Sequence, residues 1–549
     1  MGIAARPPRV RLHGLLGKAL ERSCSCRLKT VDYRKMADPF RLRNETDNAW
    51  RCEFWGKVVR SAILTNYHLQ DPELAVLIRD TVRDIMSTQT ADGCISTYPA
   101  EKQLGGWDVW GRKYVLLGLL RYYDLVEPDE AVKNCCVRLL DHLMTQIGPG
   151  RADIRDCGQH EGLAPASILG AAVGVYRISG EPRFLDFARY IVQTGCSKRH
   201  DIFEAARAGV YPKDIGNGKA YEMTSCFQGL AELYPFDPKP EYREVCVKYF
   251  EAVRAREIFI TGAAGGKDRF GEIWDDGAWK QTVPDYPGGL GETCVTATWL
   301  HYCERIAGLT HSVRAAEEVE RSLYNGILGA MAPDNSHWVH VNPRLLGGFK
   351  QSAVDQIGFC FKTPYDGHDC CRAQGPEGLA MAPRLAVMQS GNAVDLNLFE
   401  PLTADLPGTA KIEVTGNYPL EPAAQIRITA ERPFELNLRT PADLKQVRLN
   451  GAPLQFEPGS RLTLNRKWTA DDRLELEFDL AVREIVSPDG KYRAFQRGPL
   501  LLAEDSRGDV PHALCHEECH GHRLIDYITA GDGMSGENTL KVWFSPDEL

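Results

Sequence analysis

The stretch "CVTATWLHYCERIA" (residues 294–307), followed by "THSVRAAEEVERSLYNGILGA" (residues 310–330), decides the fold class. Apolar residues recur in the first segment at helical spacing and define one face of a helix: Val295, Trp299, Tyr302 and Ile306. The second segment predicts another helix directly after it. We therefore expect a helical hairpin, and the same rhythm extends over residues 50–390.

Four more hairpins are predicted before this one: residues 57–69 with 73–88, 111–125 with 129–146, 165–178 with 182–195, and 221–234 with 239–255. Gly, Pro and Asp mark the breaks, as in "TADGCIS" (90–96), "ISGEPRF" (178–184) and "YPFDPKP" (234–240). Repeated hairpins without a tight sequence repeat predict an α/α toroid, in which inner and outer helices alternate. Loops at one end of such a toroid line a pocket.

After about residue 390 the apolar period changes from 3.6 to 2. Segments such as "QIRIT" (425–429), "RLTLNR" (461–466) and "RLELEFDL" (473–480) alternate apolar and polar residues, which predicts strands with one buried face. We expect an N-terminal extension (1–45), an (α/α)6 barrel (46–390), an antiparallel β-sandwich (391–505) and an irregular C-terminal segment (506–549). Toroids followed by sandwiches are common among carbohydrate-active enzymes, although fold alone does not determine function.

The composition excludes several classes. The 549 residues carry a net charge of −9 and no dense basic block, which argues against nucleic-acid binding. Neither a signal peptide nor a run of about 18 apolar residues is apparent, so we expect a cytoplasmic protein without membrane spans. In that compartment the 17 cysteines are not expected to form a disulfide framework. A homodimer formed through the sandwich is compatible with the sequence, which does not otherwise indicate the oligomeric state.

Two cysteine clusters contain potential metal ligands. "GGLGETCVTATW" (288–299) offers Glu292 and Cys294 at the start of a helix, and "GHDCCRAQGPEG" (367–378) offers the adjacent pair Cys370 and Cys371. One carboxylate and three thiolates suit tetrahedral zinc. Adjacent ligands require an unusual backbone turn, which we expect near Gly375-Pro376. Spacing alone leaves open the simpler reading that these are unrelated buried thiols.

Other segments contain candidate acid/base and sugar-binding residues. Glu272 in "RFGEIWDDGAWKQT" (269–282) is followed by Trp274 and Trp279, and a carboxyl beside aromatic rings can have a raised pKa and act as a general acid. It could equally be a surface glutamate near packing side chains. In "GGWDVWGRKY" (105–114), Trp107, Asp108 and Trp110 suit stacking and hydrogen bonding to a sugar, with core packing as the alternative.

Taken together, the motifs resemble those of glycoside hydrolase family 127, the β-L-arabinofuranosidase-type enzymes. The resemblance extends from "WRCEFWGK" (50–57) to "AFQRGPLLLAED" (494–505). Its marks, in order, are "FWGK", "TADG", "YRISGEPRFLDFA", "GEIW", "GETCVTATW", "ERSLYNGILGAM", "NPR", "CCRAQGPEGL" and "QRGPLL". Several are weak alone, but their order and spacing are specific.

The resemblance implies an (α/α)6 barrel with β-sandwich domains and a retaining exo-glycosidase with a zinc-bound cysteine nucleophile. Residue by residue, it implies that Cys370 is the nucleophile and a zinc ligand, and that Glu272 is the acid/base. The other implied ligands of Zn²⁺ are Glu292, Cys294 and Cys371. Such a mechanism is physically coherent, because zinc keeps a cysteine ionised at neutral pH and a carboxyl group can protonate the leaving oxygen.

The sequence departs from the family in the residues expected to contact the sugar. Where the better-known members have histidines, this chain has Lys219, Pro165 and a residue within 111–113. His368 stands where those members tend to have another cysteine, and it could hydrogen-bond a zinc-bound sulfur. Together with Lys219, we expect Tyr221 to contact the substrate. These differences indicate a divergent branch with a different sugar.

The segment "HALCHEECHGH" (512–522) is rich in His and Cys but lacks zinc-finger spacing, so we expect no structural metal there. Two rival functions remain open at this point. A polysaccharide lyase on the same toroid would require a Tyr or His base, and no such set stands out. A non-catalytic carbohydrate-binding or structural zinc protein would not require Glu272.

Overall fold

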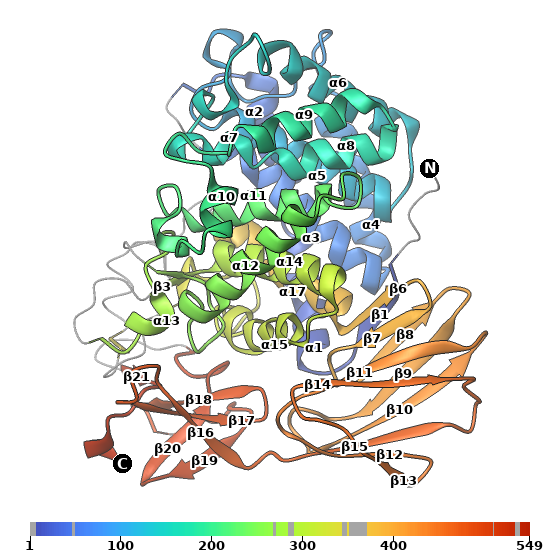
Figure 1. Cartoon of the computed structure of the whole chain (residues 1–549), viewed down its shortest axis with the longest axis vertical. Coiled ribbons are helices and arrows are strands. Elements are labelled where there is room, and N and C mark those ends of the chain that lie inside the picture. The colour runs from blue at the N-terminus through green and yellow to red at the C-terminus, as the bar shows by residue number, and fades with distance from the viewer. Residues whose placement is uncertain are drawn as a thin grey trace.

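The computed structural model describes residues 7–46, 50–266, 271–283, 290–342, 349–350, 370–508, 510–532 and 539–549. Helices make up the first part of the chain and β-sheets the last part, and the two parts lie side by side (Figure 1). The predicted fold class, an (α/α)6 barrel followed by antiparallel sheets, is confirmed.

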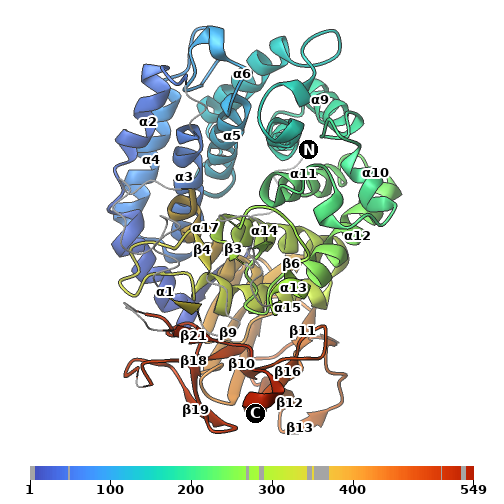
Figure 2. The ribbon, with the colours of Figure 1, turned by 90° about the vertical axis from the view of Figure 1, so that its left-hand side faces the viewer.

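Six helices form the inner ring of the barrel (Figure 2): α3 (Phe54–Leu69), α5 (Asp108–Leu125), α8 (Leu169–Ser179), α11 (Ala220–Leu233), α14 (Thr293–Thr310) and α17 (Cys370–Ala386). Each contacts the next, and α17 returns to α3, so the ring is closed. These helices are buried on nearly all sides, because one side faces the outer helices and the other the barrel interior.

Each inner helix forms a hairpin or pair with an outer helix. The outer helices are α4 (Pro72–Met86), α6 (Glu130–Gln146), α9 (Pro182–Gln193), α12 (Pro240–Arg256), α15 (Val313–Arg321) and α1 (Leu15–Ser23). The inner helices α8 and α14 also contact a second outer helix, α6 and α12 respectively. They are amphipathic; α4, for example, begins at Pro72 with an Asp71 cap and buries one stripe that includes Ile78 and Val82. The N-terminal α1 pairs with α17 and so completes the sixth hairpin.

Within the described residues, four further helices lie in the connections: α2 (Tyr33–Leu42), α7 (Leu163–Ala166), α10 (Ile202–Arg207) and α13 (Gly277–Lys280). The segment His160–Ser179 is long and apolar enough to cross a membrane by composition. It includes α7 and the inner helix α8, and 72% of its apolar window is buried inside the protein. Core burial therefore accounts for its apolar character.

Two sheets form the sandwich. The larger has the order β1 (Arg9–Leu12), β8 (Leu402–Leu406), β9 (Ala410–Gly416), β10 (Ala423–Ala430), β15 (Arg473–Phe478), β12 (Leu444–Leu449) and β13 (Ala452–Leu454). The smaller has the order β14 (Ser460–Arg466), β11 (Phe434–Thr440), β7 (Ala393–Leu396) and β6 (Val387–Ser390). Strand β15 alternates buried and exposed residues, as its sequence predicts. Strand β1 pairs with β8, so the N-terminus joins the sandwich.

A third sheet follows the sandwich: β16 (Val482–Val486), β17 (Arg493–Arg497), β18 (Leu500–Asp505), β20 (His522–Asp526) and β19 (His516–Cys519). Strand β21 (Thr539–Lys541) pairs with β18 and with β5 (Phe349–Lys350). The C-terminal segment, expected to be irregular, thus contributes three strands. Its own core, which includes Leu501, Ile525 and Trp543, explains why it is ordered.

A small sheet lies at the barrel end where the inner helices begin. It consists of β2 (Gly265–Gly266), β3 (Leu290–Glu292) and β4 (Val341–Asn342). Strand β3 runs directly into α14, and its pairing with β4 brings residues near 340 beside Glu292. Two segments of the chain that are separated by about fifty residues therefore meet at the barrel mouth.

Candidate active site

The vicinal cysteines begin the inner helix α17. Cys370 and Cys371 are its first two residues, so helical geometry directs their side chains about 100° apart. The expected turn at Gly375-Pro376 is absent, because both residues lie inside α17. Gly375 serves packing instead: a Cβ there would lie 2.4 Å from the Trp338 ring.

The Glu292-x-Cys294 pair spans the junction of β3 and α14. Glu292 is the last residue of β3 and caps α14 in an extended conformation, whereas Cys294 lies in the first helical turn. This change of conformation lets both side chains face α17. The α14–α17 contact of the inner ring therefore brings the two motifs together.

Of the four predicted ligands, Glu292, Cys370 and Cys371 converge, whereas Cys294 is not part of that group and lies beside Cys371. Cys371 Sγ lies 3.5 Å from Glu292 Oε1 and 3.3 Å from Cys294 Sγ. Cys370 Sγ lies 3.8 Å from Glu292 Oε1 and 3.9 Å from Cys371 Sγ. All are buried except Cys370, which is half-buried and hence the most accessible of the three sulfurs.

A histidine that the sequence analysis missed joins this cluster. His340 Nδ1 is 3.8 Å from Cys370 Sγ, and its Nε2 is 3.9 Å from Glu292 Oε1. Ligand atoms of Glu292, His340, Cys370 and Cys371 all lie within 4.8 Å of one another. His340 directly precedes β4, and the pairing of β3 with β4 brings it beside Glu292. These residues could hold a metal ion.

The electrostatics of the cluster suit a divalent cation. Hydrogen bonding to Cys294 and burial raise the pKa of Cys370 to about 11. Burial opposes ionisation of Cys294, but hydrogen bonds from Cys370 and Cys371 and the Lys57 ammonium lower its pKa to about 7. Burial and the nearby Glu272 hold the pKa of Glu292 well above its ordinary value. Cys370 and Glu292, which resist ionisation alone, and Cys294, which ionises readily, fit a cation such as zinc that would compensate their charge.

Glu272 approaches the cluster from the loop before α13. Its Oε1 lies 3.8 Å from His340 Nε2, and its other oxygen forms an ion pair with Lys219 Nζ. Burial raises the pKa of Glu272. The hydrogen bond from His340 and the charge of Lys219 outweigh this effect and lower the pKa to about 2. The sequence had suggested a raised pKa from neighbouring tryptophans. Trp274 instead bonds to Tyr249 in the core, and Trp279 is 45% exposed beside Arg256.

Lys219, which stands where the family has a histidine, lies directly before α11 and is 6% exposed. Burial lowers the pKa of Lys219, but Glu222 and Glu272 outweigh it and raise the pKa above its ordinary value. Of the other two such positions, Pro165 lies in α7 and residues 111–113 lie in α5. His368 lies outside the described residues.

The three candidate sugar contacts of segment 107–110 lie in different environments. Asp108 is buried, accepts hydrogen bonds from Arg112 and the Leu104 backbone, and therefore stabilises the start of α5. Trp110 is buried too, and its Nε1 donates to Glu53 Oε2 at 2.5 Å. Trp107 is half-buried, with its ring 5.4 Å from that of His160, and is the most accessible of the three to a sugar.

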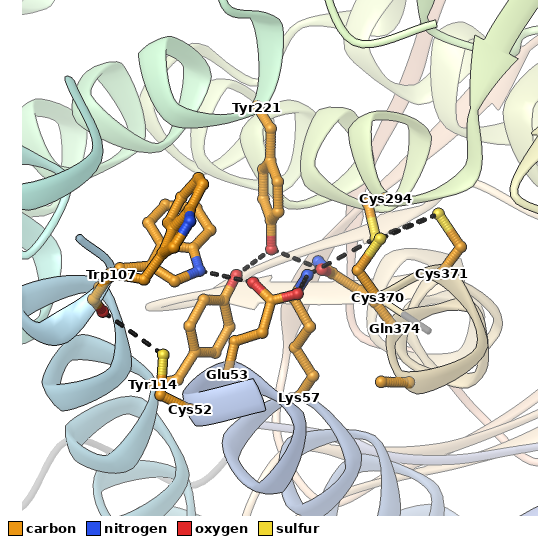
Figure 3. Close-up of polar contacts among 12 residues, drawn as sticks. Cys52, Glu53, Lys57, Trp107, Tyr114, Tyr221, Cys294, Cys370, Cys371 and Gln374 are labelled. Atoms are coloured by element: carbon orange, nitrogen blue, oxygen red, sulfur yellow. Dashed lines mark hydrogen bonds and ion pairs between the residues drawn. The ribbon is translucent and has the colours of Figure 1, made fainter. Parts of the chain in front are cut away.

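A buried polar network lies beneath the cysteines (Figure 3). Tyr221 donates to Gln374 Oε1 of α17 at 2.5 Å and also contacts the Tyr114 hydroxyl. Lys57 of α3 donates to Glu53 Oε1 at 2.9 Å and to Cys294 Sγ at 3.6 Å. The sequence predicted Tyr221 as a substrate contact, but it assigned no role to Lys57 and Glu53, which occur in the motif "WRCEFWGK".

The His/Cys-rich segment 512–522 is not assembled as a metal site among the residues that the structure describes. Three of its four histidines pair separately with carboxylates: His512 with Asp532, His520 with Glu484 and His522 with Glu504. His512 lies before the β19–β20 hairpin, His520 lies in its turn and His522 begins β20, so the hairpin does not gather them.

Comparison with known proteins agrees with this architecture. A family model described as "Beta-L-arabinofuranosidase, GH127 catalytic domain" matches residues 19–384, and the GH127 middle domain matches residues 393–480. A non-reducing end beta-L-arabinofuranosidase of Bifidobacterium longum subsp. longum is 21% identical, over 85% of this chain and 76% of the relative.

Solved structures show the same fold. A GH127 beta-L-arabinofuranosidase from Geobacillus stearothermophilus T6 superposes with a TM-score of 0.77 at 18% identity, over 98% of this chain and 99% of the other. The GH127 beta-arabinofuranosidase BT3674 gives 0.79 at 18% identity, over 98% and 97% of the two chains. Because the catalytic-domain model covers more than half of the sequence and contains the whole cysteine cluster, the chain belongs to glycoside hydrolase family 127.

Proposed function

We propose that this glycoside hydrolase is a retaining exo-enzyme of the β-L-arabinofuranosidase type, with Cys370 as nucleophile and Glu272 as acid/base. One observation carries the proposal. The half-buried Cys370 sulfur and the Glu272 carboxylate approach opposite nitrogens of the same imidazole, that of His340, at 3.8 Å each. A nucleophile and an acid/base are thereby held at one small site.

The residues that would hold the metal are Glu292, Cys294, Cys370 and Cys371, with His340 within reach. Bound there, Zn²⁺ would supply positive charge that keeps the sulfurs ionised at neutral pH. Cys294 and Cys371 are fully buried and suited to remain as ligands. Cys370 is the sulfur that a substrate can reach.

The chain's own groups then perform a double displacement. Cys370 Sγ forms a bond to the anomeric carbon while the bond to the leaving oxygen breaks, and Glu272 gives its proton to that oxygen. In the second half, the Glu272 carboxylate takes a proton from water. The water oxygen bonds to the anomeric carbon and displaces the Cys370 sulfur, so the configuration is retained.

The substrate class follows from the relatives and from the site. The Bifidobacterium and Geobacillus enzymes are beta-L-arabinofuranosidases by name, so we propose a glycoside with a terminal furanose. Lys219 changes the surroundings of the acid/base relative to a histidine, because it gives Glu272 a full positive charge as a partner. A sugar other than arabinofuranose is compatible with this difference.

A panel of synthetic aryl glycosides, β-L-arabinofuranosides first, tests the proposal with wild-type protein and two variants. We expect Cys370→Ser to abolish turnover of every substrate. We expect Glu272→Gln to abolish it for poor leaving groups but to spare part of it for dinitrophenyl glycosides, which need little protonation. Cys26→Ser, which removes an exposed cysteine of the N-terminal region, is the matched control. Full activity in Cys370→Ser would refute the assignment of the nucleophile.

A further inference from the structure

A lysine is buried directly behind the cysteine cluster. Lys57 is 1% exposed, which is rare for lysine because removing an ammonium from water is costly. Its Nζ lies 4.9 Å from the centre of the Tyr221 ring and 5.4 Å from that of Tyr114. These aromatic faces stabilise the cation but do not account for its hydrogen-bonding capacity of three N–H groups.

The partners of Lys57 explain its place. One N–H group donates to Glu53 Oε1 at 2.9 Å, and Glu53 is fixed by Trp110 Nε1 on its other oxygen. A further donor reaches Cys294 Sγ at 3.6 Å. Lys57 thus bridges a buried carboxylate and a sulfur of the cluster (Figure 3). A hydrogen bond from an ammonium to sulfur is strongest when the sulfur carries negative charge, as a metal ligand does.

The contact distinguishes between the three sulfurs. Lys57 approaches Cys294, which is fully buried, from the interior of the barrel. Cys371 is 3.3 Å from Cys294 and also donates to the His340 carbonyl oxygen at 3.6 Å. Cys370 also hydrogen-bonds to Cys294, but its other contacts, with Glu292, His340 and Cys371, lie on the more accessible side. Cys294 therefore lies on the side of the cluster that Lys57 contacts, and Cys370 lies on the side that solvent can reach.

We propose that Lys57 is a positioning residue of the metal centre. Its hydrogen bond holds the Cys294 sulfur as a permanent ligand and offsets part of the cluster's negative charge. Cys370 is thereby left as the sulfur that can move toward the substrate. This inference rests on the proposed function, since it requires a metal at the cluster, and it assigns to Lys57 no direct contact with substrate.

Lys57→Met tests the role, with Zn²⁺ affinity measured by chelator competition and the sulfur-to-metal charge-transfer band recorded on the Co²⁺-substituted protein. Loss of a hydrogen bond that orients a metal ligand typically weakens metal binding about 10- to 100-fold, and we expect that loss here. We also expect the band to move to lower energy, because the Cys294 sulfur loses a donor. Unchanged Zn²⁺ affinity together with an unchanged band would overturn the inference.

Two further variants separate this role from a structural one. Lys113→Met removes another buried lysine, which donates to Ser167 Oγ at 2.9 Å and lies over the Trp110 ring. It should leave the Zn²⁺ affinity and the band as in the wild type, and a similar loss in both variants would refute a specific role for Lys57. In Glu53→Gln/Lys57→Met, no unpaired carboxylate remains. If the double variant recovered wild-type affinity, the stranded Glu53 would be the cause and the inference would be wrong.

The outcomes also separate this inference from the proposed function. Wild-type protein that binds Zn²⁺, combined with an unaltered Lys57→Met variant, contradicts only the role of Lys57. Wild-type protein without Zn²⁺ affinity contradicts both. Retained turnover in Cys370→Ser contradicts the assigned nucleophile, whatever the Zn²⁺ affinity of the Lys57 variant.

Discussion

Replacing Lys219 should change the pH dependence of the first catalytic step. Lys219 and His340 lower the pKa of Glu272 from its ordinary 4.5 to about 2, against the effect of burial. At ~1.4 kcal/mol per pKa unit, this preference for the carboxylate corresponds to roughly 3 kcal/mol. Glu272 is 24% exposed, so solvent screens this interaction only in part. Lys219→Met removes the positive charge, and the pKa of Glu272 should rise.

The sign of the effect follows from the role of Glu272. In the proposed mechanism the first step needs the protonated form of Glu272, so kcat/KM of the wild type should fall about tenfold per pH unit across the range above 4. In Lys219→Met the fall should begin only above the new, higher pKa. If that pKa is ~4, the protonated fraction at pH 6 rises from about one in ten thousand to about one in a hundred.

The assay is kcat/KM against pH for an aryl furanoside with a poor leaving group. Lys219→Arg keeps the positive charge and should keep the wild-type slope, and Lys113→Met should keep it as well. The shape of the curve decides the matter, because a change in sugar affinity moves the whole curve vertically. The measurement therefore has to extend to about pH 3, where a raised pKa of Glu272 gives a plateau. A Lys219→Met profile that keeps rising tenfold per pH unit down to that pH, as in the wild type, would refute the electrostatic reasoning.

Three further predictions concern stability. Gly56→Ala should lower the melting temperature by an amount equivalent to about 1–3 kcal/mol, because its Cβ would lie 2.3 Å from the Tyr114 carbonyl oxygen. Arg60→Met should cost about 3–5 kcal/mol in urea unfolding, since it strands the buried Glu377, whose Oε1 lies 2.8 Å from Arg60 and 3.0 Å from His301. Burial raises the pKa of Glu377, but Arg60 and His301 outweigh it and lower the pKa to about 2. The contribution of the Glu377 carboxylate to folding stability should therefore be complete above pH 4.5 and be lost as the pH falls toward 2. The melting temperatures of Glu377→Gln and wild type should accordingly converge in acid.

Much of the barrel could be predicted because its helices repeat a simple pattern. Apolar spacing in segments such as 294–307 indicates a helix without reference to the rest of the chain. The sixth hairpin could not be recognised in this way, because α1 (Leu15–Ser23) and α17 (Cys370–Ala386) are separated by most of the sequence. Pro376 and Pro383 inside α17 also make it look broken, although ring packing keeps it helical.

The sequence likewise predicts only part of the candidate site. Spacing identified Glu292 and Cys294 as a pair and Cys370 and Cys371 as another, but it left their meeting undecided. Family resemblance supplied that connection, and the α14–α17 contact of the closed ring brings the pairs within 4 Å. His340 could not be found from local sequence, because its proximity depends on the pairing of β4 with β3.

Two lysine–glutamate pairs adjoin the cluster, and their burial assigns them different tasks. Lys57 and Glu53 have side chains that are 1% and 4% exposed, so opening this pair would leave two charges without water. Lys219 and Glu272 are 7% and 24% exposed, and water can reach the carboxylate when the pair opens. In the proposed mechanism, proton exchange with a leaving group and with water therefore suits the outer pair, whereas the inner pair is suited only to a fixed charge arrangement. The same residue types would thus serve proton transfer at one side of the cluster and ligand positioning at the other, because solvent reaches only one of the two pairs.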